Sequence, residues 1–172
     1  MASLMENLIE LLEAECSTYE KLLDLSMQKT PVIIEGKVEV LTKITDDESE
    51  LVSVINRIDK QREVVMKDIA TVLNKDVATL KLGQIEMMLS ERPEEQRRLS
   101  EVHGKLKLVI SQMQRVNEHN RVLIEKSLEL VEYNMNVVKS MRTAPTTANY
   151  TKGAYSAGNT MGSAQNGFDT KQ

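Results

Sequence analysis

The sequence predicts an all-α fold, an elongated antiparallel bundle or hairpin of long, coiled-coil-like helices followed by a disordered C-terminal tail. Apolar residues recur every three or four positions through most of the first 142 residues, which is the period of one helix face. Aromatic residues make up only 3% of the 172 residues although 41% are hydrophobic, whereas compact globular cores draw much of their buried area from aromatics. Glycine and proline are scarce before residue 143, so little interrupts long helices. We therefore divide the chain into a helical bundle domain, residues 1–142, and a flexible tail, residues 143–172.

The first helix is predicted over residues 2–29. Its apolar residues follow each other in alternating steps of four and three: Met5, Ile9, Leu12, Cys16, Tyr19 and Leu23. Neighbouring leucines widen this stripe into a face that points to a core. Thr30-Pro31 is expected to end the helix, because the residue before a proline is pushed out of the α region. Gly36 marks a second break before the next helix.

The second helix is predicted over residues 37–73, with an apolar seam of nearly five heptads that begins at Leu41 and ends at Val72. Glu48 and Arg62 are the only polar residues in the seam. Fourteen residues of helix place them roughly 21 Å apart, so they cannot pair with each other. Asn74 to Asp76 is expected to form a turn, in which Asp76 is the N-cap of a short helix through about Leu89.

The last helix, predicted from Pro93 to Arg142, carries the clearest signal. Proline suits the first helical position and the acids Glu94 and Glu95 suit the helix dipole. One stripe repeats without a skip for six heptads: Leu99, Val102, Leu106, Val109, Met113, Val116, Asn120, Leu123, Ser127, Leu130, Asn134, Val137 and Met141. A second stripe lies beside it: Ile110, Ile124, Leu128, Val131, Met135 and Val138. Together they widen the apolar arc to roughly 160° in the last four turns, more than one neighbouring helix covers.

The polar residues within these seams have two interpretations. Asn120, Ser127 and Asn134 in the last helix, like Glu48 and Arg62 in the second, could set the register of the bundle. Alternatively, they weaken the packing of part of the seam, so that a helix of another protein can replace a helix of the bundle there. Methionine adapts to irregular apolar partners, so Met135 and Met141 fit core filling and partner binding equally well.

Composition excludes several classes of function. A net charge of −4 with charges of both signs alternating argues against nucleic acid as a partner. His103 and His119 lie about 24 Å apart along one helix and cannot share a metal. Cys16 is the only cysteine, and its place in an apolar seam favours a buried structural thiol. Since no acid, base, nucleophile or ligand constellation is visible, we expect no enzymatic activity and no cofactor.

The N-terminus carries acids rather than early basic residues, and no run of eighteen apolar residues occurs. We therefore expect neither a signal peptide nor membrane insertion, and a cytoplasmic protein. The segment 143–172 has no periodicity and too little apolar surface to offset the cost of ordering, which predicts disorder.

Several motifs, in their order along the chain, resemble the FlgN-type flagellar export chaperones. In the last helix, Asn117 and Asn120 form an N-x-x-N pair ahead of Leu123 and of a Ser127-Leu128 step. The second helix is similar to the run L-x-x-L-x-x-x-E-x-x-L-x-x-x-I of the family, which continues to a K-x-R at Lys60 and Arg62. The tail, with Tyr150 and Gly153, is like the tails of Gram-positive members.

The resemblance implies a cytosolic chaperone of flagellar type III export, which holds hook-associated proteins of the filament junction and delivers them to the flagellar export apparatus. It places the client contact on the last helix: Asn120, Leu123, Ile124, Ser127, Leu128, Val131, Met135 and Val138. Tyr150 and Tyr155 are candidate contacts with the export gate. The alternative is a structural coiled-coil or adaptor protein, whose apolar stripe closes a homodimer when no client is present.

Overall fold

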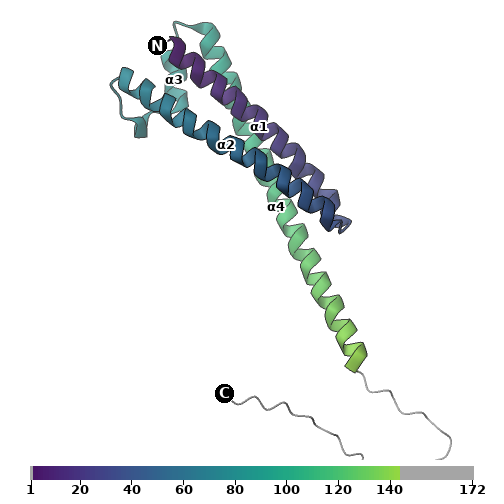
Figure 1. Ribbon diagram of the computed structural model, residues 1–172. Coiled ribbons are helices and arrows are strands. Elements are labelled where there is room, and N and C mark those ends of the chain that lie inside the picture. Colours follow the sequence, from purple (N-terminus) through teal and green to yellow (C-terminus); the bar gives the residue numbers. More distant parts are fainter. Residues whose placement is uncertain (1, 144–172) are drawn as a thin grey trace, which may run out of the picture. The chain divides into compact units, whose positions relative to one another are not determined.

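The computed structural model describes residues 2–143 and is helical almost throughout (Figure 1). Its elements are α1 (Ala2–Ile34), α2 (Val38–Val72), the 3₁₀ turn η1 (Val77–Thr79), α3 (Leu82–Met88) and α4 (Pro93–Thr143). No strand occurs in these residues, and the predicted all-α class is confirmed. The chain divides into two compact units, Met1–Met135 and Asn136–Gln172. The description below concerns the first unit unless the second is named.

The three long helices alternate in direction. Glu15 contacts Arg62 and Ser26 contacts Glu48, so α1 and α2 form an antiparallel hairpin. Arg98 bonds to Glu6 near the start of α1, and Asn120 bonds to Thr30 near its end. Helix α4 therefore runs parallel to α1 and antiparallel to α2, as an up-down-up bundle requires.

Helix α1 continues through Pro31 to Ile34, so the predicted end at Thr30-Pro31 is wrong. Pro31 removes only one backbone donor, the one that would bond to the carbonyl of Met27, and its own carbonyl still accepts from Glu35 N at 2.9 Å. The actual stop is Gly36, which has φ +65°. The amide of Lys37 bonds to the carbonyl of Val32 and that of Gly36 to that of Ile33. This pair of bonds is a Schellman motif, which satisfies the last carbonyls of the helix.

The short connection at the other end of the bundle differs from the single helix that the sequence predicts. The Asp76 side chain does act as a cap, accepting a bond from Ala78 N at 3.0 Å, but it caps only the 3₁₀ turn. The backbone is extended at Leu80 before α3 begins. This break turns both Leu80 and Ile85 into the core, where they are 6% and 0% exposed. A continuous helix would not place two residues five positions apart on one face.

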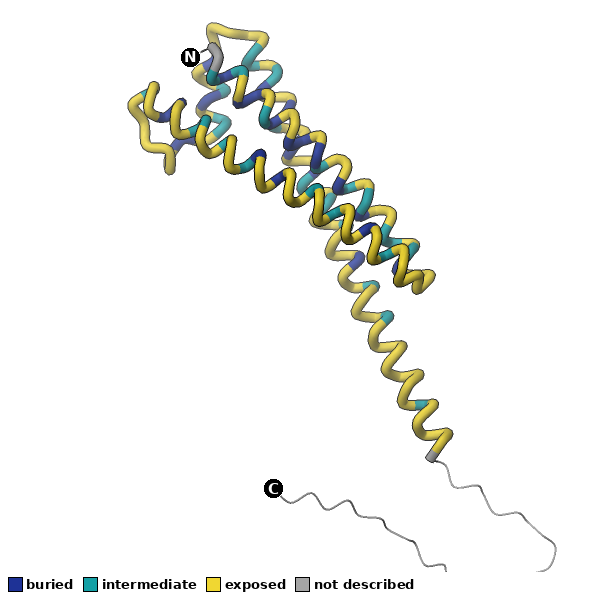
Figure 2. The backbone as a smooth tube through the Cα atoms, in the orientation of Figure 1, coloured by how far each residue is buried: buried dark blue, intermediate teal, exposed yellow. Residues whose placement is uncertain are grey.

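The core lies where all four helices meet, at the N-terminal end of α1 (Figure 2). It joins Met5, Leu8, Ile9, Leu12 and Cys16 of α1, Ile69 and Ala70 of α2, Leu80, Ile85 and Leu89 of the connection, and Leu99, Val102 and Leu106 of α4. Towards the Gly36 turn, the buried residues thin out to a narrower seam that includes Leu22, Ile44 and Ile55. No helix among the described residues is long and apolar enough to span a membrane.

Candidate functional site

Burial along α4 changes abruptly at Asn120. Asn120 is 3% exposed and is the last buried residue of the helix among those described. From residue 121 to residue 135 every side chain is exposed except Leu123 and Ser127, which are half-buried (Figure 2). Because Thr30 contacts Asn120 and α1 ends four residues later, α1 supplies little cover beyond this level.

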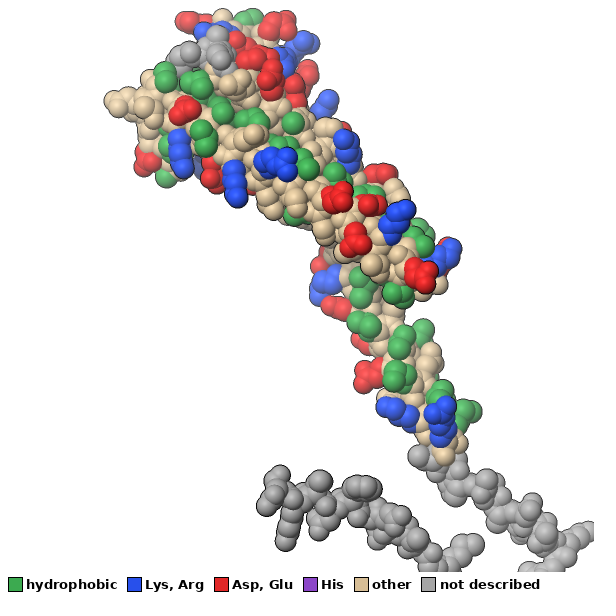
Figure 3. All heavy atoms as spheres, viewed as in Figure 1, with side chains coloured by type: hydrophobic (Ala, Val, Ile, Leu, Met, Phe, Trp, Pro, Cys, Tyr) green, Lys and Arg blue, Asp and Glu red, His purple; other side chains and the backbone are tan. Residues whose placement is uncertain are grey.

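This uncovered segment, residues 121–135, is called the free segment of α4. It is rich in exposed apolar side chains: Val122, Ile124, Leu128, Leu130, Val131, Tyr133 and Met135. Leu128 is 64% exposed, and Val131 and Met135 are each 54% exposed. Figure 3 shows hydrophobic side chains gathered along this part of the helix. Ile124, Leu128, Val131 and Met135 lie within one sector of the helix, and an exposed apolar sector is a common feature of surfaces that bind other proteins.

Ion pairs along α4 support its helical state. Arg121 bonds to Glu118 and Glu125, both at 2.7 Å, and Lys126 bonds to Glu129 at 2.8 Å. These pairs have the (i, i+3) and (i, i+4) spacing that stabilises a solvated helix. The bonds from Arg121 also lower the pKa of the Glu118 carboxyl. The charged side chains of the free segment are thus largely paired with each other along the helix, while the apolar side chains between them are largely exposed.

A layer of polar side chains joins the three helices just before the free segment begins. The Asn120 amide donates to the carbonyl of Ser26 at 2.7 Å and accepts from the Thr30 hydroxyl at 2.7 Å. The Ser26 hydroxyl donates to Glu48 at 2.8 Å, and Lys29 pairs with the other oxygen of Glu48 at 2.7 Å. Asn120 is therefore bonded within the bundle, which is the register-setting interpretation, and it is not on the exposed surface with the other predicted client contacts.

The remaining polar seam residues divide between two environments. The Ser127 hydroxyl bonds to the carbonyl of Leu123 in its own helix at 2.9 Å, and Asn134 is exposed. Arg62 lies 3.3 Å from buried Glu15 and also bonds to Asp59. Burial raises the pKa of the Glu15 carboxyl, Arg62 opposes this, and Asp59 adds to it. As predicted, Glu48 and Arg62 do not pair with each other; each pairs with α1.

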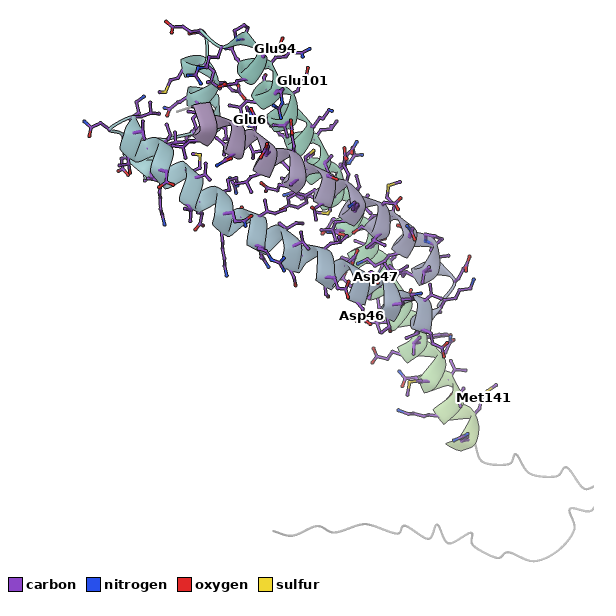
Figure 4. All side chains as sticks on the ribbon, turned by 45° about the horizontal axis from the view of Figure 1, so that its top comes forward. Glu6, Asp46, Asp47, Glu94, Glu101 and Met141 are labelled. Carbon is purple, nitrogen blue, oxygen red and sulfur yellow. The ribbon has the colours of Figure 1, made fainter. Side chains whose placement is uncertain are left out.

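The cysteine and the two histidines considered in the sequence analysis do not come together into a site. Cys16 is buried, as predicted. His103 contacts Glu86 at 2.8 Å, and His119 is exposed. Acidic side chains such as Glu6 and Glu101, or Asp46 and Asp47, stand on the outside of the helices (Figure 4). Within residues 2–143, no cluster of His, Cys, Asp or Glu could hold a metal ion.

In the second unit, Val138 is 49% exposed and Met141 is 73% exposed. Tyr150 and Tyr155 lie outside the described residues.

Asn120, Glu48 and Arg62 bond between the helices of the bundle, whereas the apolar side chains of the free segment stay exposed on α4. The family model described as FlgN protein matches residues 1–156, and the chain belongs to the FlgN family. This is a chaperone family of flagellum assembly rather than an enzyme family, and it implies binding of flagellar export substrates. The resemblance seen in the sequence motifs is thereby confirmed. Neither the curated proteins nor the solved structures gave a match.

Proposed function

We propose that the chain is a cytosolic chaperone of the flagellar type III export system. It binds the terminal amphipathic helices of hook-associated junction proteins, prevents their premature assembly, and delivers them to the export gate. The observation that supports this most directly is the apolar stripe of the free segment, which consists of exposed Ile124, Leu128, Val131 and Met135 beside half-buried Leu123. Val138 continues the same spacing. An amphipathic client helix laid along such a stripe is a recurring mode of recognition.

The stripe offers enough apolar surface for reversible capture. Full burial of a Leu, Val or Met side chain is worth about 1.5–3 kcal/mol, so covering the exposed parts of Leu128, Val131 and Met135 contributes about 4 kcal/mol. Other client contacts add to this, and the cost of association subtracts from it. Covering the apolar face of the client withholds it from assembly, and no nucleotide is needed for this step.

The family assignment and the apolar stripe leave a second candidate, a structural or adaptor protein that uses the stripe as a homodimer interface. The same exposed side chains favour it, because two copies of α4 could cover each other. Light scattering separates the two: a dimer that persists when client is added supports the adaptor, and a chain that dissociates to bind client supports the chaperone.

The test of client binding is co-purification and calorimetric titration with terminal helical segments of hook-associated proteins from the same bacterium. We expect a defined complex with every terminal segment that is amphipathic, and no binding to the central domains of the same proteins. If no terminal segment binds, the proposed client class is wrong.

For delivery, we propose that Tyr150 and Tyr155 contact the export apparatus. A chain truncated after residue 143 should still bind client segments but should fail to support their secretion. Double replacement of Tyr150 and Tyr155 by alanine should do the same. Normal secretion with both variants would remove the tail from the mechanism.

A further inference from the structure

The apolar residues of the last part of α4 form two rows. Row one is Val116, Leu123 and Leu130, spaced seven residues apart, and row two is Ile124, Leu128, Val131 and Met135. At about 100° per residue, the two rows occupy neighbouring sectors of the helix that together span about 160°. Leu130 is 60% exposed and Leu128 is 64% exposed, so each row has a leucine without cover.

Row one continues a row that the bundle already covers. Val102 and Val109 occupy the same heptad position as Val116, and they are 5% and 7% exposed. The position stays apolar at Leu123 and Leu130, past the level at which α1 ends. A helix from another chain is therefore expected where α1 and α2 no longer cover α4.

Row two includes a heptad position that is polar in the part of α4 that packs within the bundle. Counting back by heptads from Met135 and Leu128 gives Arg121, Gln114 and Lys107, which are all exposed. The change from polar to apolar at this heptad position falls between Arg121 and Leu128, within the free segment. One helix packs along a single seam of about two positions per heptad, and a wider apolar arc requires a second neighbour. The apolar arc of the free segment is thus wider than that of the bundled part of α4, in addition to being exposed.

A groove beside the bundle extends row one. It measures about 710 Å³ and lies between Leu23, Met27 and Thr30 of α1 and Arg115, Val116 and His119 of α4. Met27 is 57% exposed, and Val116 is itself the first residue of row one. Arg115 stands at the rim and makes no ion pair with any of the described residues. An Asp or Glu on a helix that binds in this groove would form an ion pair with Arg115.

We propose that the free segment of α4 is covered by two helical segments of one client, one on each row. The row-one segment begins in the groove between α1 and α4 and places an Asp or Glu against Arg115. This inference rests on the proposed function, since it specifies how the client fills that surface. The client and α4 together then form a three-helix bundle that continues the one made by α1, α2 and α4.

The test uses three probes titrated into the full chain by calorimetry: each terminal helical segment of one hook-associated protein alone, and both joined by a flexible linker. Leu130→Gln alters row one and Leu128→Gln alters row two. We expect each isolated segment to lose about tenfold in affinity with only one of these variants. The joined probe should lose affinity with both, and should bind the wild-type chain about 100-fold or more tighter than either segment.

Arg115→Glu tests the groove, with Arg57→Glu as the matched control, because Arg57 is also exposed and lies on α2. Charge reversal at Arg115 should weaken the row-one segment by about three- to fivefold, and reversal at Arg57 should not. Equal effects of the two reversals would remove the acidic contact from the proposal.

Three outcomes overturn the two-segment arrangement and are distinct from failure of the proposed function. A single segment that loses affinity equally with Leu128→Gln and Leu130→Gln straddles both rows. A joined probe without any gain in affinity shows that one segment suffices. A stable dimer that both variants disrupt shows that a second copy of this chain covers the rows. Absence of binding by every probe would instead remove the proposed function itself.

Discussion

Replacing Leu128 and Val131 together by glutamine should abolish client capture while the fold is kept. Both side chains point to solvent, with exposed fractions of 64% and 54%. Glutamine is a good helix former, so helix content should not fall. Since neither residue contributes to a buried cluster, the free energy of unfolding should change by less than about 0.5 kcal/mol.

The expected loss of affinity follows from the area that the client would cover. Burying the exposed part of Leu128 is worth about 1.6 kcal/mol and that of Val131 about 1.1 kcal/mol. The two losses together weaken binding by about 50- to 100-fold. For a client held with micromolar affinity, this moves the dissociation constant to about 0.1 mM, beyond the range of a pull-down.

Calorimetric titration with the terminal helical segment that covers row two measures the loss, and circular dichroism measures helix content in the same sample. The matched control is Val64→Gln with Met87→Gln, because these residues are 57% and 78% exposed but lie on α2 and α3. The control should bind as the wild type does. If the Leu128/Val131 variant retains full affinity, or if the control loses as much, then the free segment of α4 is not the client site.

Four further changes test the bundle itself. Asn120→Ala removes two hydrogen bonds to α1 and should lower the free energy of unfolding by about 1–3 kcal/mol in urea titrations. Gly36→Ala should lower it by about 1–2 kcal/mol, because φ is +65° there and an added Cβ meets no atom, so the cost is purely conformational. Gly104→Ala, also with open space at the Cβ, should raise it by about 0.5–1 kcal/mol. With Glu15→Gln, stability should fall less as pH rises above 4.5, because burial raises the pKa of Glu15 above its ordinary 4.5 and the wild type therefore loses stability as pH rises through the raised pKa.

Helix type and extent could be predicted from the sequence because the heptad pattern is local. The bounds of α2 and the start of α4 agree with prediction within about one residue, as expected where caps and breakers coincide with the pattern. The rule that failed was the one for Pro31. It treats proline as a stop wherever it stands, but three residues from the end of a helix proline removes a single hydrogen bond. Continuing the helix also buries Ile33, which is 6% exposed.

The partners of polar seam residues could not be predicted, because they lie on another helix. Nothing near Glu48 in the sequence indicates Lys29 and Ser26 as its partners, and nothing near Arg62 indicates Glu15. These contacts depend on the register of α1 against α2, which the turn at Gly36 sets. For the same reason, the sequence placed Asn120 among the client contacts, whereas its amide is used within the bundle.

The surplus of apolar surface could be predicted, but the point at which it begins could not. Periodicity reports how wide the apolar arc of α4 is, and it gives the same apolar signal at Val109 and at Leu130. Which of the two is buried depends on where the hairpin of α1 and α2 ends along α4, and the contact of Thr30 with Asn120 places that end close to residue 120. The polar layer therefore marks the boundary between the two uses of one helix. Before it, the bundle covers most apolar residues of α4, and after it, most are exposed.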